Sequence, residues 1–455
     1  MSLTTTRTGR RTPLIRALSI QRGRGDLLDE VMAITAMIVV PLDVPVFEPI
    51  RPAVTLLILA VVAWRWRSVQ RVLLDGAYVF ALPALCLASL VWADAAWPAL
   101  RHGALLALTM VIAGTMAARL DRRQFVVALL LSQGMLAAWS WLDGTTVWSG
   151  GLDGSLSLIG IFPQKNVIGQ RMMLLTLACV AVLLVPGYRW ALRLVAGATL
   201  PLALAIIWRS GSASALILVS GAGAILLFAL FVWRPASRVR GARPVIAFGT
   251  AAALALGLLV LTSVLRIDPA GDLLAALGKD STLTGRTDVW AVAFQSVRDH
   301  PALGVGAGNF WRHDSWAAVQ LVQRFPGADP TSFNFHNAYF EALVHLGAVG
   351  MATAAFVWWR GAGVVVWAWW TNQRAGDPFW VALAAALMLR SFVESELFRP
   401  TLPGAILFWF AVFAAEHGRR EARRSGRREA LRRRGAARRA ATATPAPTAT
   451  GAAPA

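Results

Sequence analysis

Long apolar runs, separated by short basic or polar stretches, recur from residue 28 to residue 417. A helix that crosses a bilayer needs about 20 mostly apolar residues. The expected spans are 28–47, 52–64, 76–92, 100–118, 124–142, 167–186, 191–208, 213–232, 245–265, 338–358, 379–397 and 403–417. The sequence therefore predicts an all-α, polytopic membrane protein with about 12 transmembrane helices.

Composition excludes the soluble classes of protein. The 455-residue chain is 57% hydrophobic and only 15% charged, which is too apolar for a core enclosed by a wet surface. The net charge is +20, but the arginines fall between the apolar runs and in the tail. They therefore indicate membrane topology and not a nucleic-acid partner. Cys86 and Cys179 lie inside apolar runs, where they act as small buried hydrophobic residues.

The basic residues also set the orientation of the chain. If the N-terminus is cytoplasmic, alternate connections on the inner side hold most of the 44 Lys and Arg residues, as the positive-inside rule requires. We therefore expect a basic cytoplasmic tail over residues 1–27, a transmembrane domain over 28–417 and an Arg-rich, low-complexity, disordered cytoplasmic tail over 418–455. Anionic membrane lipids are an expected partner of the second tail.

One external connection, residues 266–337, is far longer than an ordinary loop, and such loops tend to be functional. Within it, TGRTDVWAVAFQSVRDHP predicts a helix with an apolar stripe of Trp290, Ala293, Phe294 and Val297. That stripe would lie on the membrane face. The segment LGVGAGNF follows with three glycines, but no strand precedes it, so it predicts a turn and not a nucleotide-binding loop.

Charged side chains near the outer ends of the spans are the main candidates for function, because such groups are costly in lipid. They can converge on one external cavity: Arg51, Lys165, Arg171, Arg209, Arg286, His336, Arg390, Glu394, Glu396 and Arg399. The guanidinium fork suits phosphate oxygens, so the cluster indicates an anionic lipid headgroup such as a diphosphate. An ordinary ion pair is the alternative for each arginine, with Arg390 and Glu394 at i,i+4 on one helix face as an example.

His336 and Asn337 open the apolar segment FHNAYFEALVHLGAVG. Imidazole titrates near neutral pH, so His336 is suited to take a proton from a hydroxyl, and Asn337 would position a sugar or fix the tautomer. A satisfied histidine at a helix entrance is an equal alternative. His345 lies on another helix face and is expected to be a core histidine bonded to a neighbour. The chain has no HExxH, CxxC or outward DxD motif, so no metal is expected.

Five segments between about residues 150 and 400 together resemble the superfamily of O-antigen ligases and Wzy-type polysaccharide polymerases, which are integral membrane glycosyltransferases. The first two are GIFPQKNVIGQRM, with Lys165 and Asn166, and WRSGSASALIL. The third is TGRTDVW, with a Gly-Arg-x-x-x-Trp element. The last two are FHNAYFEALVHLGAVG, with a His-Asn element, and FVESELFRP.

This resemblance implies a GT-C-like membrane glycosyltransferase fold in the bacterial inner membrane, with the active site facing the periplasm. It implies transfer of glycan from a polyprenyl-diphosphate-linked oligosaccharide to an acceptor hydroxyl, with inversion and without metal or other cofactor. His336 would be the catalytic base and Arg286 would contact the diphosphate. Further substrate contacts would come from Lys165, Asn166, Asn337, Arg390 and Glu394.

The chain departs from the family pattern at Ala213, where Arg or Lys is frequent. Arg209 shares that helix face four residues earlier and would replace the missing charge; Arg171 or Arg51 could also supply it. The acceptor stays open. A polymerase would extend exopolysaccharide or O-antigen, with a chain-length regulator as partner, a ligase would use lipid A-core, and a third member type would glycosylate protein.

A transporter or lipid flippase is the alternative from a different class. Such a protein would carry charged groups through the membrane midplane, whereas the candidates here lie at the outer boundary.

Overall fold

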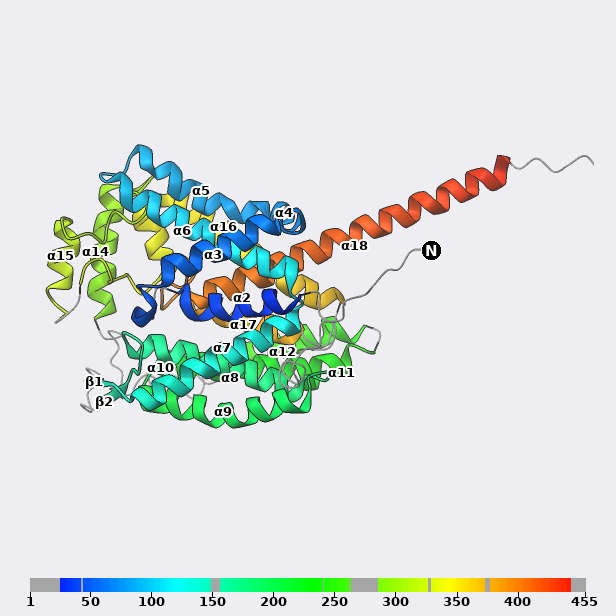
Figure 1. Ribbon diagram of the computed structural model, residues 1–455, viewed down its shortest axis with the longest axis horizontal. Helices are drawn as coiled ribbons and strands as arrows, with labels where there is room; N and C mark the ends of the chain where they lie inside the picture. Colours follow the sequence, from blue (N-terminus) through cyan, green and yellow to red (C-terminus); the bar gives the residue numbers. More distant parts are fainter. Residues whose placement is uncertain are drawn as a thin grey trace, which may run out of the picture.

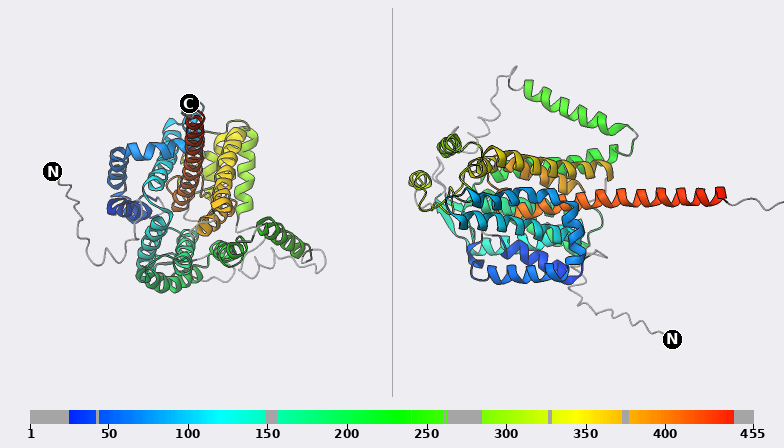
Figure 2. Two further views of the ribbon diagram at one scale, coloured as in Figure 1. Left: turned by 90° about the vertical axis from the view of Figure 1, so that its right-hand side faces the viewer. Right: turned by 90° about the horizontal axis from the view of Figure 1, so that it is seen from above.

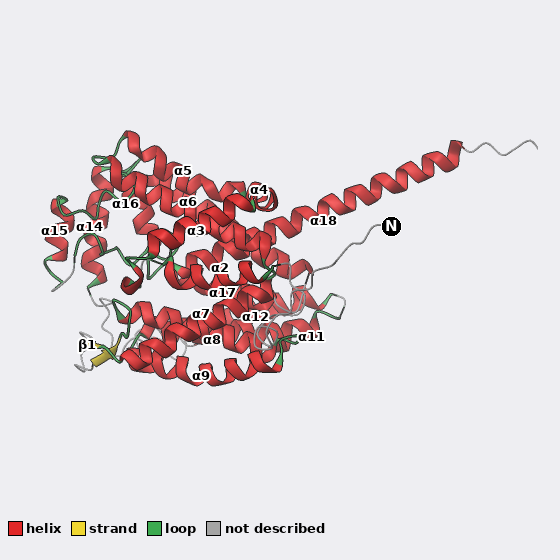
Figure 3. Ribbon diagram, in the orientation of Figure 1, coloured by secondary structure: helices red, strands yellow, loops and turns green. Residues whose placement is uncertain are grey.

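The computed structural model describes residues 25–41, 44–148, 156–239, 241–260, 262, 285–325, 329–372 and 377–442. Within these ranges the chain is almost entirely helical (Figure 1, Figure 3), which confirms the all-α class. The strands in these ranges form one antiparallel pair, β1 (Thr146–Trp148) with β2 (Leu156–Leu158). The predictions for residues 1–24, 263–284 and 443–455 lie outside the described part of the chain.

The helices of the first half are α2 (Leu27–Val39), α3 (Arg51–Trp64), α4 (Trp66–Asp75), α5 (Ala81–Ala88), α6 (Ala96–Arg119), α7 (Arg122–Asp143) and α8 (Lys165–Leu184). The second half contains α9 (Trp190–Ser210), α10 (Ala213–Phe228), α11 (Arg234–Ala236), α12 (Ala242–Leu259), α14 (Arg286–Asp299), α15 (Trp316–Val322), α16 (Ala338–Asn372), α17 (Asp377–Arg390) and α18 (Pro403–Thr442). Short 3-10 turns cover Pro45–Phe47, Ala77–Phe80 and Ser89–Val91, and a π turn covers Ala229–Trp233.

Local sequence signals set the ends of several helices. At the start of α7, the Asp121 carboxylate accepts hydrogen bonds from the Arg123 and Gln124 backbone amides, and the Gln124 side chain accepts one from the Asp121 amide. This capping box satisfies amides that have no partner within the helix. Gly144 ends α7 in a left-handed conformation with φ of 66°, which glycine adopts without a steric cost.

Every one of the twelve expected spans contains helix, but fewer helices meet the length and apolarity that a span requires. Six do so: α6, α7, α8, α9, α10 with its continuation to Ala236, and α16. A seventh arises if α3 and α4, which meet at 91°, are one bent span. The shorter apolar helices cover Ala77–Val91, Ala242–Leu256 and Pro378–Arg390. The described residues therefore support a multi-pass membrane protein, and the number twelve and the GT-C-like fold stay predictions.

The bundle has two different ends. Helices α14 and α15 and the strand pair lie at one end, whereas α18 leaves the bundle at the other end and projects well beyond it (Figure 1). The right-hand view of Figure 2 shows the same extension standing apart from the neighbouring helices. Helices α14 and α15 and the Arg-rich segment of α18 are thus at opposite ends of the molecule.

Three boundaries differ from the sequence prediction. Helix α17 ends at Arg390, so the predicted span 379–397 is too long and Glu394 lies in a turn segment after the helix. Helix α16 continues to Asn372, through most of a segment that was expected to connect two spans. Helix α18 continues through the arginine block to Thr442, whereas the prediction was disorder after residue 417.

Helix α16 is interrupted at Gly347, where φ is 62° and ψ is −160°. The external loop fills this break. The Val305 and Gly306 amides donate to the Val344 and His345 carbonyls at 3.1 and 2.9 Å, and on the far side of the break the Ala348 amide donates to the Pro301 carbonyl at 2.9 Å. These bonds satisfy backbone groups that the interrupted helix leaves unpaired.

Glycine is required at the break, because a Cβ at Gly347 would lie 2.2 Å from the Ala302 carbonyl carbon. The facing segment LGVGAGNF forms turns with positive φ at its three glycines, so the turn interpretation is confirmed.

Two hydrophobic cores are present in the described residues. The large one joins the helices of the bundle. The second is a smaller aromatic core at the end of the bundle that carries α14 and α15. Its buried members are Val289, Ala293, Phe310, Trp311, Ala318, Leu321, Val322, Phe335 and Val344. We call this second unit the external core.

Candidate active site

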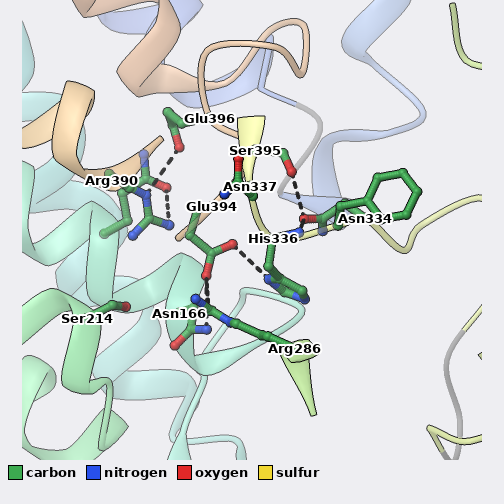
Figure 4. Close-up of polar contacts among 12 residues, drawn as sticks. Asn166, Ser214, Arg286, Asn334, His336, Asn337, Arg390, Glu394, Ser395 and Glu396 are labelled. Atoms are coloured by element: carbon green, nitrogen blue, oxygen red, sulfur yellow. Dashed lines mark hydrogen bonds and ion pairs between the residues drawn. The ribbon is translucent and has the colours of Figure 1, made fainter. Parts of the chain in front are cut away.

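Four segments that are far apart in the sequence bring polar side chains together at the end of the bundle next to the external core. They are the first turn of α8 with Asn166, the first residue of α14, Arg286, the residue pair before α16 with His336, and the turn after α17 with Glu394. Figure 4 shows these side chains directed toward one another, with Glu394 in the middle.

Glu394 is the centre of this cluster. Its Oε1 accepts from Arg286 Nη2 at 3.0 Å and from Asn166 Nδ2 at 3.2 Å, and its Oε2 lies 3.0 Å from His336 Nδ1. Burial opposes ionisation of this carboxyl, but the charges of His336, Arg390 and Arg286 outweigh burial and lower its pKa to about 2. Glu394 is therefore an ionised hydrogen-bond acceptor at any physiological pH.

His336 presents one ring nitrogen to Glu394 and has the other available. Because an ionised carboxylate can only accept, Nδ1 carries a proton and donates it to Glu394. The structure gives Nε2 no hydrogen-bond partner among the described residues, and the side chain is 17% exposed. The ring also meets the edge of Phe333 at a centroid distance of 5.9 Å. In the neutral imidazole, Nε2 is then the basic nitrogen.

The Asn166 amide links this cluster to a neighbouring helix. Its Oδ1 accepts from Ser212 Oγ at 3.1 Å, and Ser212 caps α10 through the Ala215 amide. Ser214 Oγ lies 3.3 Å from Ser212 Oγ. The segments that resembled the family therefore do meet in space, since Asn166, Ser212, Arg286, His336 and Glu394 come from all five of them.

Arg390 is not the i,i+4 partner of Glu394 that the sequence suggested. Helix α17 ends at Arg390 and the chain continues in turns, where the Glu394 amide donates to the Arg390 carbonyl at 2.7 Å, while the two side chains contact other partners. The Arg390 side chain is 3% exposed; Nη2 donates to Gln170 Oε1 at 3.2 Å, and Nε lies 3.5 Å from Glu396 Oε2. Arg390 still adds positive charge near Glu394.

The three arginines considered as replacements for a basic residue at position 213 have separate surroundings. Arg171 is fully buried and donates to the Met37 carbonyl and to Gln133 Oε1, so it joins α8 to α2 and α7. Arg51 donates to the Val39 and Val44 carbonyls after α2. Arg209 is exposed, with its guanidinium 5.2 Å from the centroid of the Trp141 ring. None of these contacts is with Glu394 or His336.

The last two predicted contact residues lie beside the cluster. Lys165 is the first residue of α8, next to Asn166, and is half-buried. Asn337 caps α16, because its Oδ1 accepts from the Tyr339 and Phe340 amides at 2.9 and 3.1 Å. Its Nδ2 donates to the Phe392 carbonyl at 3.0 Å. Asn337 therefore holds the helix entrance to the turn that carries Glu394.

Sequence reasoning missed Glu341. This carboxylate is 2% exposed and pairs with His345 Nε2 at 3.1 Å, and His345 Nδ1 donates to the Gly306 carbonyl at 3.1 Å. His345 is thus a core histidine bonded to its neighbours, as predicted. The available signal was the i,i+4 spacing of Glu341 and His345 within an apolar helix, because a buried carboxylate there requires a partner.

Helices long and apolar enough to cross a membrane indicate a multi-pass membrane protein, and a charged, partly buried cluster lies at one end of its helix bundle. Residues 198–355 match the family model described as O-antigen ligase. The exopolysaccharide production protein ExoQ of Rhizobium meliloti (strain 1021) is 28% identical over 346 residues, which cover 74% of this chain and 76% of that relative. These matches bear out the resemblance to the superfamily of O-antigen ligases and polysaccharide polymerases.

This relation supports a function of the O-antigen ligase or exopolysaccharide polymerase type, with a lipid-linked oligosaccharide and an acceptor as the substrates that the family implies. Arg286 and His336 fall inside the matched segment 198–355, whereas Asn166 and Glu394 lie outside it. The contacts of Glu394 with three distant segments therefore come from the structure and not from the family match.

Proposed function

We propose that the protein is an inverting, metal-independent glycosyltransferase. It transfers glycan from a polyprenyl-diphosphate donor to an acceptor hydroxyl on the periplasmic side of the inner membrane, with both termini in the cytoplasm. The observation that carries this proposal is the contact of Glu394 Oε2 with His336 Nδ1, which leaves Nε2 as a base, while the Arg286 guanidinium binds the other oxygen of the same carboxylate.

The reaction follows from these positions. Nε2 of His336 takes the proton from the acceptor hydroxyl as its oxygen forms a bond to the anomeric carbon of the donor glycan. The bond from that carbon to the diphosphate oxygen breaks, and the polyprenyl diphosphate leaves with the electron pair. One in-line displacement inverts the anomeric centre. The imidazolium that forms is stabilised by the ionised Glu394.

The leaving group would be stabilised by arginine. Arg286 uses Nη2 for Glu394, and a guanidinium has five N–H donors, so other donors remain for phosphate oxygens. Glu394 also holds Arg286 in place, with the Arg286 side chain 14% exposed. Preorganised donors directed at developing negative charge are usually a large part of catalysis.

The distribution of basic residues indicates which side of the membrane the cluster faces. The cluster lies at the end of the bundle opposite to the extension of α18 (Figure 1), and that extension carries the arginine block. Since basic segments stay in the cytoplasm, the cluster would face the periplasm.

For the acceptor, we favour another lipid-linked glycan, so that the enzyme polymerises repeat units of exopolysaccharide or O-antigen. The name of the relative, an exopolysaccharide production protein, supports this choice. The description of the matched family model supports the second candidate, a ligase that transfers glycan to lipid A-core. A chain-length regulator is a partner expected only of a polymerase.

The test uses purified full-length protein with a defined polyprenyl-diphosphate oligosaccharide as both donor and acceptor. We expect products that grow by whole repeat units, and we expect His336→Ala to remain folded in detergent while kcat falls by about 10²–10⁴-fold to a residual rate. Normal turnover by His336→Ala would remove that residue from the mechanism. Product only when lipid A-core is added would replace polymerase by ligase.

A further inference from the structure

Glu341 connects more segments near the candidate site than any local role in α16 requires. Its Oε1 accepts from the Phe335 amide at 2.7 Å and from Ser395 Oγ at 3.2 Å. Its Oε2 accepts from Trp311 Nε1 at 3.2 Å and faces His345 Nε2. All of these contacts are buried. One carboxylate therefore joins the loop before α16, the turn after α17 and the external core.

Two of these partners directly adjoin His336 and Glu394 in the sequence. Phe335 precedes His336, and Ser395 follows Glu394. Asn334 adds a cross-connection, since its Oδ1 accepts from the His336 amide at 2.9 Å and lies 2.9 Å from Ser395 Oγ, whose single proton is shared between Asn334 Oδ1 and Glu341 Oε1. Glu341 thus holds the residues next to His336 and Glu394 at one point.

His336 and Glu394 are attached to two separately packed units, the external core and the helix bundle. Phe335 is a fully buried member of the external core and contacts Phe310 and Trp311 with ring centroids 4.8 and 4.6 Å apart. Glu394 follows α17, whose apolar side chains belong to the core of the bundle. The distance between His336 and Glu394 therefore depends on how the external core sits on the bundle.

We propose that Glu341 is a positioning residue that fixes the alignment of the external core on the bundle and thereby sets the contact between His336 and Glu394. This inference rests on the proposed function, because it concerns the geometry of the same base. Glu341 itself touches neither substrate nor the reacting atoms. Its action is through the Phe335 amide and the Ser395 hydroxyl.

The chemistry of the contacts selects variants that separate hydrogen bonding from charge. Both ring nitrogens of His345 face acceptors, so one proton is shared between His345 Nε2 and Glu341 Oε2, and the pair is neutral as a whole. In Glu341→Gln, the amide oxygen can still accept from Phe335 and Ser395 while the amide nitrogen donates to His345 Nε2. Only Trp311 Nε1 loses its acceptor. In Glu341→Leu, every one of these acceptors is absent.

The experiment measures kcat and KM for the lipid-linked donor with purified full-length variants. We expect Glu341→Leu to lower kcat about 100-fold, as a misplacement near 1 Å does, with KM little changed, and Glu341→Gln to retain most of kcat. Glu416→Leu is the matched control. Glu416 is also a fully buried carboxylate, but it lies in α18 and pairs with Arg360 and Arg419. This control variant should leave kcat per folded protein unchanged.

A double-mutant comparison decides between positioning and general stability. If Glu341 acts through His336, then Glu341→Leu causes no further loss in a protein that already carries His336→Ala. An equal loss of residual activity in both backgrounds overturns the inference while the proposed function stands. Normal activity of His336→Ala alone removes His336 from the mechanism instead, and absence of transfer by the unmodified protein overturns the proposed function.

Ser395→Ala provides a second variant if Glu341→Leu does not fold. It removes one Glu341 contact and the Asn334 contact without burying a new group. We expect a smaller fall in kcat, again with KM unchanged and again absent in the His336→Ala background. A kcat equal to that of the unmodified protein would contradict the inference.

Discussion

Replacing Glu394 by Gln tests the arrangement of the site with an almost isosteric change. In this variant, the side-chain oxygen must stay toward Arg286 and Asn166, since both present N–H donors to it at 3.0 and 3.2 Å. The amide nitrogen must then face His336 Nδ1 and donate to it. Nδ1 becomes an acceptor, so the proton of the neutral imidazole moves to Nε2 and the base is lost.

The size of the effect follows from this change of tautomer. General base catalysis contributes about 10²–10⁴ to the rate, and the matching Asp to Asn change in a Ser-His-Asp triad lowers kcat about 10⁴-fold for the same reason. We expect Glu394→Gln to lower kcat by a factor in this range, or about 3–5 kcal/mol in activation free energy. KM for the donor should change little, because Arg286 keeps its acceptor.

The assay is glycan transfer by the purified variant under conditions of excess donor and acceptor, with thermal unfolding in detergent as a check of folding. Glu416→Gln serves as a control, because it makes the same substitution at a fully buried carboxylate far from the cluster. A kcat of Glu394→Gln close to that of the unmodified protein would refute the tautomer argument and the base assignment with it.

Three further predictions follow from the same contacts. Arg286→Lys keeps the charge but loses the planar fork, so we expect a large fall in kcat/KM for the diphosphate donor; near-normal turnover would count against a guanidinium contact. The pKa of Glu394 lies below its ordinary value of 4.5, so its contribution to stability is present above that value and is lost as the pH falls toward 2. The difference in unfolding temperature between the unmodified protein and Glu394→Gln should accordingly shrink as the pH falls from about 4.5 toward 2, whereas a difference that stays unchanged over that interval would be inconsistent with an ionised Glu394. Transfer activity should persist in excess chelator, because arginine is proposed to neutralise the leaving diphosphate; an absolute requirement for a divalent ion would contradict that role.

Most of the helical architecture follows from hydropathy, because lipid-facing and core-facing helices alike must be apolar. The breaks do not follow from it. Gly347 interrupts α16 only because the backbone of residues 301–306 supplies replacement hydrogen bonds, and that loop segment is about forty residues away along the chain. Helix α17 likewise stops at Arg390 within an apolar run that reads on to residue 397. Hydropathy predicts neither the break at Gly347 nor the end of α17 at Arg390.

The residues of the site could be nominated from sequence, but their partners could not. Glu394 and Arg390 have helical spacing, and the i,i+4 rule pairs them, yet the helix has ended before Glu394. The true partners of Glu394, Arg286 and His336, are 108 and 58 residues away in sequence. Such contacts depend on how the external core packs on the bundle. Glu341 shows the same limit, because two of its partners, Trp311 and Ser395, are 30 and 54 residues away in sequence.

The backbone conformation of His336 explains why two asparagines, Asn334 and Asn337, lie close to this histidine at the entrance of an apolar helix. Its φ is 51°, a left-handed conformation that costs a non-glycine residue about 1–2 kcal/mol. Asn334 holds the amide of His336 from one side, and Asn337 caps the following helix and binds the Phe392 carbonyl, two residues before Glu394. The two asparagines thus stabilise an unfavourable backbone and tie it to the turn that carries the carboxylate. The unit that defines the site is therefore the histidine together with both asparagines, since the imidazole alone would have no fixed direction.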